Sequence, residues 1–167
     1  MTESHPHKPW RTDPAFNGFG HPSYPDDFRA LFILIGETVR ALEDMWVRLS
    51  AVVPRPDGSG ATLGYRGTLL NQPHTPAGLA KGAKVLIRWV PGQKQPYYVS
   101  PVALANLRDF ECQCRGCGFD MHPFPLTEVA AAQFPDVADG FLPVQFTTGC
   151  PVCPETMLVT NRSAAMN

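Results

Sequence analysis

Two Cys-x-x-Cys pairs constrain the fold of this chain more than any other feature of its sequence. Cys114 and Cys117 form the first pair, and Cys150 and Cys153 form the second. A gap of two residues lets both sulfurs of a pair bind one tetrahedral ion at about 2.3 Å across a tight turn. Two such turns complete a four-cysteine shell with no open position, which is typical of structural zinc. The sequence therefore predicts one structural Zn²⁺ ion held by these four cysteines.

The segments beside the cysteine pairs resemble those of a zinc ribbon, in which each pair lies at the end of a β-hairpin. We expect strands that lead into the first pair over residues 110–112 and into the second over 141–147. A third strand is expected to leave the second pair over 157–160. Gly116 and Gly118 are expected to supply the positive φ angles that the first turn needs.

The insert between the pairs and the fifth cysteine allow several interpretations. The pairs are 32 residues apart, more than the usual spacing of about 15 to 20. We expect a small helix in this insert from about Thr127 to Phe134, with Thr127 as its N-cap. Cys112 could replace Cys114 as a ligand, lie buried or be a free thiol, and we favour a buried position or one beside the ligands. A redox pair and unrelated buried thiols are the alternatives, although neither pair clearly opens a helix as a redox pair does.

The composition indicates one ordinary domain or two very small ones. Apolar residues make up 44% of the 167, enough for a core, while 17% charged residues and 18 prolines favour short strands and many turns. A net charge of −1 gives no general attraction for nucleic acid or for anionic membranes. No apolar run approaches the about 18 residues of a membrane span, and the N-terminus lacks the features of a secretory signal. Because the cysteines are arranged for metal binding and not for disulfides, we infer a cytoplasmic protein.

The predicted fold is α+β and mainly β: a small antiparallel sheet or partly closed barrel with a C-terminal zinc-ribbon-like segment. Residues 1–25, rich in Pro and His, are expected to form an extended arm whose aromatic side chains pack on the domain. Residues 26–110 are expected to form a β-rich α+β domain. Residues 111–167 are expected to form the Cys₄ segment, packed on that domain.

Residues 27–44 fit two kinds of secondary structure. Their apolar positions from Phe28 to Leu42 follow a helical stripe, but Leu31 to Ile35 fit a buried strand equally well. Further along the chain, apolar residues predict strands at 45–53, 63–70 and 84–90. Ser100 followed by Pro101 predicts the start of a short helix.

Three short motifs in the middle of the chain resemble an uncharacterised bacterial family, domain of unknown function family 2314. They are Glu-Asp-Met-Trp-Val at 43–47, Gly-Thr-Leu-Leu-Asn-Gln-Pro at 67–73 and Gly-Ala-Lys-Val at 82–85. The resemblance covers about residues 30–100 and implies a small β-rich α+β domain, with no established activity or catalytic residues. Gly67 is expected to allow close approach of a neighbour or a bulge, and Asn71 to bond its own backbone where the strand ends.

No familiar catalytic motif is present, so we predict no enzyme and no catalytic residues. Metalloprotease, deaminase, P-loop and nucleophile-elbow patterns are all absent from the sequence. An enzyme that uses Cys112, with His122 as its base, is one alternative. The favoured interpretation is a zinc-stabilised protein that acts by binding another protein. One form of it is an immunity protein that uses acidic residues to neutralise a bacterial toxin, with Asp26, Asp27, Asp136 and Asp139 as candidates.

The other alternative is a zinc-ribbon protein that binds nucleic acid. Basic residues from Lys81 to Lys94 lie close in sequence to three aromatic residues, a combination that is found in single-strand-binding proteins. We expect the side chains of Lys84 and Arg88 to point to the opposite face of their strand from those of Val85, Ile87 and Trp89. The candidate binding surface, for either kind of partner, consists of Trp46, Lys84, Arg88, Trp89, Tyr97 and Tyr98.

Overall fold

The chain divides into two compact units. The computed structural model describes residues 8–165, apart from 39, 57, 91 and 137–141. The first unit comprises Met1–Trp89 and Gln95–Tyr98, and the second comprises Val90–Lys94 and Val99–Asn167. The main part of the second unit therefore begins at Val99, before the boundary at 111 that we expected from the cysteine-containing segment. No helix in the described ranges is long and apolar enough to cross a membrane.

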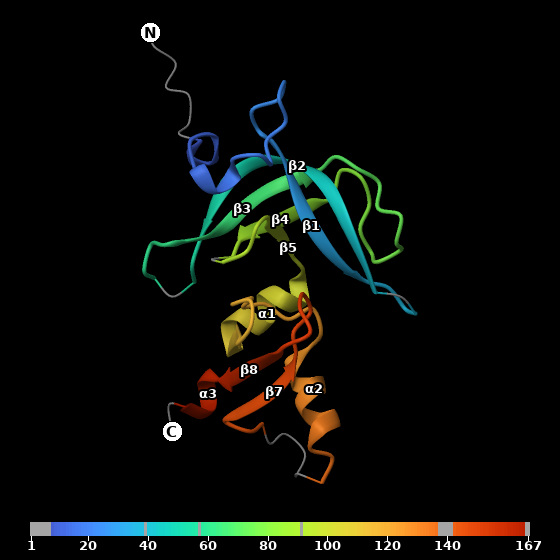
Figure 1. Ribbon diagram of the computed structural model, residues 1–167, viewed down its shortest axis with the longest axis vertical. Helices are drawn as coiled ribbons and strands as arrows, with labels where there is room; N and C mark the ends of the chain where they lie inside the picture. The colour runs from blue at the N-terminus through green and yellow to red at the C-terminus, as the bar shows by residue number, and fades with distance from the viewer. Residues whose placement is uncertain (1–7, 39, 57, 91, 137–141, 166–167) are drawn as a thin grey trace. The chain divides into compact units, whose positions relative to one another are not determined.

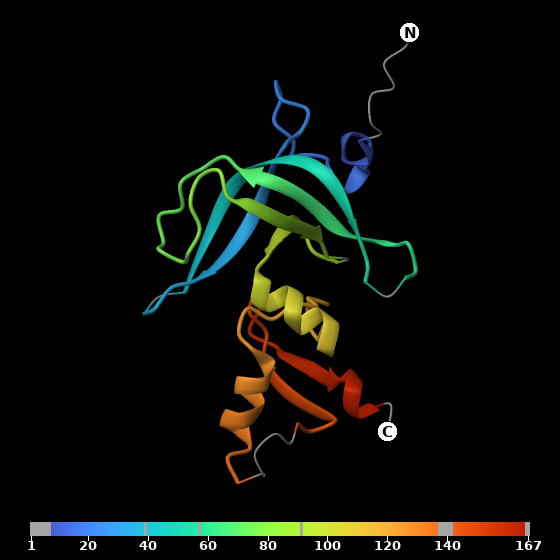
Figure 2. The same ribbon diagram turned by 180° about the vertical axis from the view of Figure 1, so that it is seen from behind.

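The first unit is a curled five-stranded sheet whose strands are neighbours in chain order (Figures 1 and 2). The strands are β1 (Asp27–Ile35), β2 (Arg40–Pro54), β3 (Thr62–Leu69), β4 (Lys84–Trp89) and β5 (Pro96–Val99). The pairs β1–β2, β2–β3 and β3–β4 are antiparallel. The sheet curls until β5 meets β1 through one parallel pair, Leu31 with Tyr97. The mainly β fold is thus confirmed: a curled sheet whose two edge strands meet only at this single residue pair.

Residues 27–44 form a strand hairpin and not a helix. The side chains of Phe28, Ala30, Phe32 and Leu34 point inward from β1, and none is more than 5% exposed. β1 pairs with β2 without interruption from Asp27–Arg48 to Ile35–Arg40. The period of two in these buried residues decides between the two local patterns that the sequence left equal, because it fits a strand with one face on a core and not a helical stripe.

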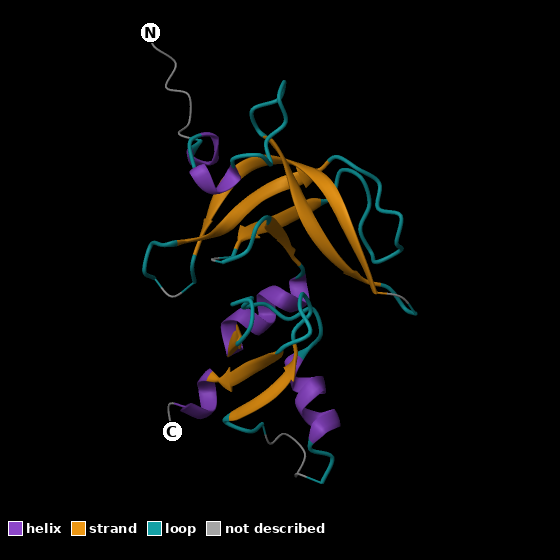
Figure 3. Cartoon of the chain, viewed as in Figure 1, coloured by secondary structure: helices purple, strands orange, loops and turns teal. Residues whose placement is uncertain are grey.

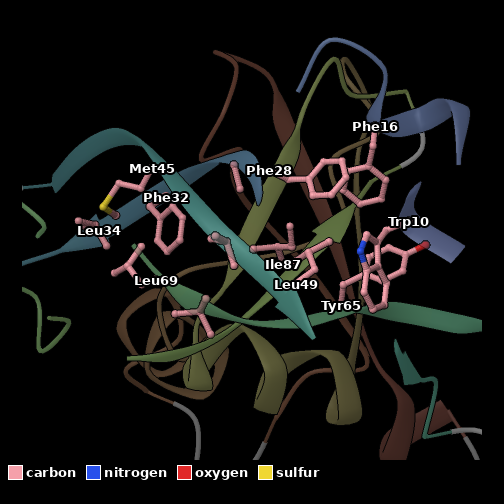
Figure 4. Packing of buried hydrophobic residues seen from close by; sticks show 13 residues of the cluster. Trp10, Phe16, Phe28, Phe32, Leu34, Met45, Leu49, Tyr65, Leu69 and Ile87 are labelled. Carbon is pink, nitrogen blue, oxygen red and sulfur yellow. The ribbon is translucent and has the colours of Figure 1, made fainter. Parts of the chain in front are cut away.

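The N-terminal arm packs its aromatic residues into the core of the first unit. It forms two short 3₁₀ turns, η1 (Pro9–Arg11) and η2 (Pro14–Phe16), so it is less extended than we expected; its residues 1–7 lie outside the described part. Trp10 and Phe16 are 2% and 3% exposed. Figure 4 shows them against the sheet: the Phe16 ring centre is 4.9 Å from Phe28 and 5.1 Å from Tyr65.

One carboxylate anchors this arm. Both oxygens of Asp26 accept hydrogen bonds from the arm: Lys8 donates at 2.7 Å, Trp10 at 3.0 Å, and Arg11 twice at 2.8 Å. The Arg11 guanidinium, more than the other donors, holds the pKa of Asp26 well below its usual range, against the effect of burial. The arm is therefore tied to the residue immediately before β1.

Two motif residues in the middle of the chain have structural roles. At Gly67 an added Cβ would lie 2.5 Å from Val47 and 2.6 Å from the carbonyl oxygen of Arg48, so Gly67 permits the close approach that we expected. A bulge also interrupts the β2–β3 register between Leu49 and Ala51. The side chain of Asn71 accepts a hydrogen bond from the backbone N–H of Trp46 at 2.6 Å. Our prediction that Asn71 would bond its own backbone is therefore wrong, because it ties the loop after β3 to β2.

The second unit is a three-stranded sheet with helices around it (Figure 3). Its elements are α1 (Pro101–Asp109), β6 (Phe110–Cys114), α2 (Leu126–Gln133), β7 (Gln145–Gly149), β8 (Thr156–Asn161) and α3 (Arg162–Ala165). Strand β8 lies in the middle and pairs antiparallel with both β6 and β7. This arrangement gives the zinc-ribbon-like segment that the sequence predicted.

The two longer helices begin in different ways. Ser100 caps α1 as predicted, because its hydroxyl oxygen accepts a hydrogen bond from the N–H of Ala103 at 3.1 Å. The prediction of Thr127 as a cap is wrong: α2 follows Pro125 and has no side-chain cap. Instead, Asn106 of α1 accepts a hydrogen bond from the N–H of Leu126 at 3.2 Å. A residue 20 positions earlier thus satisfies the first N–H of this helix.

Candidate metal centre

The pairing of β8 brings the two cysteine pairs together. Cys114 is the last residue of β6 and lies opposite Met157 of β8. Gly149, the residue before Cys150, lies opposite Thr156 of the same strand. Because Thr156 and Met157 are adjacent, both turns form at one end of the sheet. The fold therefore places four thiols side by side although 39 positions separate the first from the last.

The distances between the sulfurs fit a tetrahedral metal site. The Sγ atoms of Cys114 and Cys153 are 3.4 Å apart, those of Cys117 and Cys150 are 3.7 Å apart, and all four lie within 4.8 Å of one another. Four sulfurs bonded to one ion at about 2.3 Å would be separated by about 3.8 Å. A disulfide would need about 2.05 Å. These four cysteines can therefore hold one metal ion, as the sequence predicted.

Backbone hydrogen bonds shape both turns around this position. Gly118 N–H donates to the carbonyl of Cys114 at 3.0 Å, and Cys150 N–H donates to the carbonyl of Glu155 at 2.9 Å. Gly118 has φ +74°, as expected, but Gly116 is not among the residues with positive φ. Gly116 is needed for space instead, because an added Cβ would lie 2.5 Å from the Glu155 side chain.

The environment of the sulfurs affects their protonation in opposite directions. Burial acts to raise the pKa of Cys114, but N–H groups of Cys117 and Gly116 outweigh it and lower the pKa to about 6. The N–H of Cys117 is 3.4 Å from that sulfur. Burial raises the pKa of Cys150 to about 12. At neutral pH all four cysteines would therefore be thiolates only if a cation bound between them stabilised the negative charge.

Cys112 lies apart from this group. It is 7% exposed, sits on β6 opposite Val159, and is not one of the four residues whose sulfurs converge. Burial, with a smaller contribution from Asp120, raises its pKa to about 12. Of the positions that we considered for Cys112, the structure shows the buried one, and Cys114 keeps its place in the cluster.

The predicted binding surface is not brought together as one exposed face. Arg88 and Tyr97 are only 3% and 4% exposed. Their side chains therefore offer almost no surface to a partner. Tyr98 stacks on the core residue Phe32 at 4.7 Å. Only Lys84 is exposed, and Trp46 and Trp89 are half-buried.

The structure adds three residues near Trp46 that the sequence did not single out. The ring centres of His21 and Trp46 are 5.1 Å apart, and Tyr24 lies 4.8 Å from His21. Arg29 is paired with Trp46 across the β1–β2 ladder. The only sequence signal was the aromatic content of the arm, because these neighbours meet through pairing between strands.

Comparison with known proteins identifies no relative: no family model, curated protein or solved structure matches this chain. The resemblance to family 2314 therefore stays a prediction.

Proposed function

We propose that this protein is a non-catalytic binding protein whose second unit is held together by one structural zinc ion. The observation that carries the proposal is the convergence of four cysteine sulfurs within 4.8 Å. Tetrahedral sulfur sites suit zinc or iron–sulfur chemistry. A closed shell from two tight turns supports structural zinc, since it leaves no ligand position for water or substrate.

The position of the site supports a structural role. An ion there links the end of β6 to the connection between β7 and β8. It therefore ties together both outer strands of the sheet at one end of the central strand β8. The second unit has a small core built on residues such as Phe110, Phe146 and Val159. Small units of this kind often need a metal in addition to their core. In small zinc fingers, zinc supplies about 10–16 kcal/mol of apparent binding free energy.

The candidate catalytic pair gains no support from the geometry. Cys112 is buried, and burial raises its pKa, so its thiol stays protonated. His122 is 4% exposed and its Nδ1 faces the backbone of Phe124, 3.2 Å from the carbonyl oxygen. Both groups thus lie in packed surroundings that favour a structural role.

Another protein is one candidate for the partner that this chain binds. On the outer face of the β1–β2 hairpin, Ile33 lies opposite Leu42, which is 57% exposed. Contiguous exposed apolar surface favours protein contacts, and this pair is the part of the hairpin that we propose a partner would cover. The immunity form has less support, because Asp26 and Asp27 are engaged in ion pairs within the chain. Asp139 lies outside the described residues. The test is to isolate the complexes that the protein forms in a lysate and to compare them with those of Leu42→Glu. If the variant keeps every stable complex, the outer face of the β1–β2 hairpin is not the surface that contacts a partner.

Metal analysis of the purified protein tests the zinc proposal. We expect one zinc per chain, and its loss in Cys114→Ser and in Cys153→Ser. Cys112→Ser is the matched control, since it changes a buried thiol of the same strand that is not part of the cluster, and it should keep zinc. Full zinc occupancy in both ligand variants, or stoichiometric iron in place of zinc, would overturn the assignment.

A further inference from the structure

Alternate residues of four neighbouring strands line up on the outer face of the first sheet. Arg29 of β1 lies opposite Trp46 of β2, and Arg48 follows two residues later on the same face. Arg48 is paired with Thr68 of β3, and Thr68 with Lys84 of β4. Neighbouring strands are about 4.8 Å apart, so this line is about 14 Å long.

Aromatic rings gather at one end of this line. Trp46 is in edge contact with His21, whose ring in turn lies 4.8 Å from that of Tyr24. Tyr24 is 54% exposed, and Trp46 and His21 are half-buried. The N–H of His21 is bonded to the carbonyl of Asp27 at 2.8 Å, which fixes the loop beside β1. The rings are thus partly open to solvent and held in place.

Positive charge accompanies the rings. No described carboxylate forms an ion pair with Arg29 or Lys84; Lys84 donates to the Thr68 hydroxyl at 2.8 Å. Arg48 is 56% exposed and is held by Asp27 at 2.7 Å, which neutralises part of its charge. The first unit has ten Lys and Arg against eight Asp and Glu, whereas the second has four against seven. The net charge of −1 therefore conceals a positive first unit.

We propose that this face binds single-stranded nucleic acid. The binding strip consists of His21, Tyr24, Arg29, Trp46, Arg48 and Lys84. Bases would stack on the rings of Tyr24 and Trp46, and phosphates would follow the three cations across the strands. An acidic peptide offers charge but no row of bases to stack on the rings, and a duplex hides the faces of its bases. Asp44, on the same face two residues before Trp46, marks the acidic end of the strip.

This proposal rests on the binding role proposed above and names the ligand class. The test uses the full zinc-loaded chain and fluorescently labelled oligothymidylate and oligouridylate of about 15 nucleotides, a length near the upper site size of one small β-barrel. Fluorescence anisotropy should show saturable binding that is stronger than to a duplex of the same length. With three cations on the strip, the logarithm of the affinity should fall with the logarithm of salt concentration with a slope of about −2.

Variants separate the two components of binding. Tyr24→Ala and Trp46→Ala should each weaken binding roughly tenfold through lost stacking. Because the Tyr24 side chain is more exposed than that of Trp46, the Tyr24→Ala variant should remain folded and separates a loss of binding from a loss of fold. Lys84→Gln should reduce the salt slope by about 0.7. The matched controls are Phe134→Ala, an aromatic residue 40% exposed on the second unit, and Lys94→Gln, an exposed lysine of the same unit. Neither control should change the affinity by as much as twofold.

Three results would overturn the strip: no saturable binding of either oligomer at low salt, equal losses in strip and control variants, or tighter binding of polyglutamate than of the oligomers. Zinc content measured on the same samples keeps the two proposals distinguishable. A protein that holds one zinc and binds neither oligomer overturns the strip and leaves the metal centre in place. A protein that binds the oligomers without zinc supports the strip and overturns the metal centre.

Discussion

Replacing Asn106 with Ala should destabilise the second unit and weaken its hold on the metal. Asn106 is 6% exposed on α1. Its side-chain N–H₂ donates to the carbonyls of His122 and Phe124, at 3.0 and 2.9 Å, and its oxygen accepts from the N–H of Leu126. One side chain thus fixes the start of the insert between the two cysteine pairs.

The expected loss of stability follows from the backbone groups that would lose their hydrogen bonds to Asn106. The carbonyl of Phe124 keeps a second neighbour, Nδ1 of His122 at 3.2 Å. The carbonyl of His122 and the N–H of Leu126 would each lose the partner that Asn106 provides. A buried polar group left without a partner costs about 1–3 kcal/mol. Partial relaxation reduces the sum, so we expect Asn106→Ala to lower the free energy of unfolding by about 3 kcal/mol.

The distribution of tryptophan allows each unit to be followed separately. Trp10, Trp46 and Trp89 all belong to the first unit, so their fluorescence reports that unit alone during urea unfolding. Cobalt substituted for zinc gives a thiolate absorption that reports the second unit. Asn106→Ala should shift the cobalt transition to lower urea and leave the tryptophan transition in place. Gln133→Ala is the control: it removes an exposed hydrogen bond to Thr147 and should cost less than about 0.5 kcal/mol. A loss in Asn106→Ala no larger than in this control would refute the reasoning.

Two further predictions concern the first unit. Because the arm holds the pKa of Asp26 below its ordinary value of 3.8, this carboxylate stabilises the fold above that pH and ceases to do so as the pH falls through the folded pKa. Acid titration followed by tryptophan fluorescence, to which the buried Trp10 contributes, should therefore show release of the arm only well below about pH 4 in the native chain. Asp26→Asn should release the arm already at pH 7, and an unchanged acid profile in the variant contradicts this. Gly67→Ala should destabilise the first unit by about 1–3 kcal/mol in urea unfolding, since its Cβ would press on Val47 and on the backbone of Arg48. If Gly67→Ala is as stable as the wild type, β2 and β3 can move apart to accommodate the Cβ without loss of stability, and the reasoning is wrong.

The four-cysteine cluster was predictable because each of its two halves is local, although the pairing of β8 is needed to bring the halves together. A Cys-x-x-Cys turn places two sulfurs by itself, and two such turns have few other uses in one chain. The start of α1 was predictable for the same reason, since Ser100 caps a backbone N–H three residues away. The cap of α2 was not, because Asn106, 20 residues earlier, bonds the N–H of Leu126. Sequence patterns thus gave the interactions that close within a turn and missed those that close across the fold.

The outer strip shows the same limit more sharply, because it exists only through strand register. Arg29 meets Trp46, Arg48 meets Thr68, and Thr68 meets Lys84 only in the observed pairing. A slip of one residue would turn each of these side chains to the opposite face. The irregularity in the β2–β3 register between Leu49 and Ala51 comes just after Arg48. Arg48 therefore stays aligned with Thr68, whereas the residues of β2 after the irregularity are paired one position differently with β3. For this reason Lys84, which the sequence grouped with Arg88 along its own strand, belongs with Arg48 and Trp46, and a binding face can be sought only after the register is known.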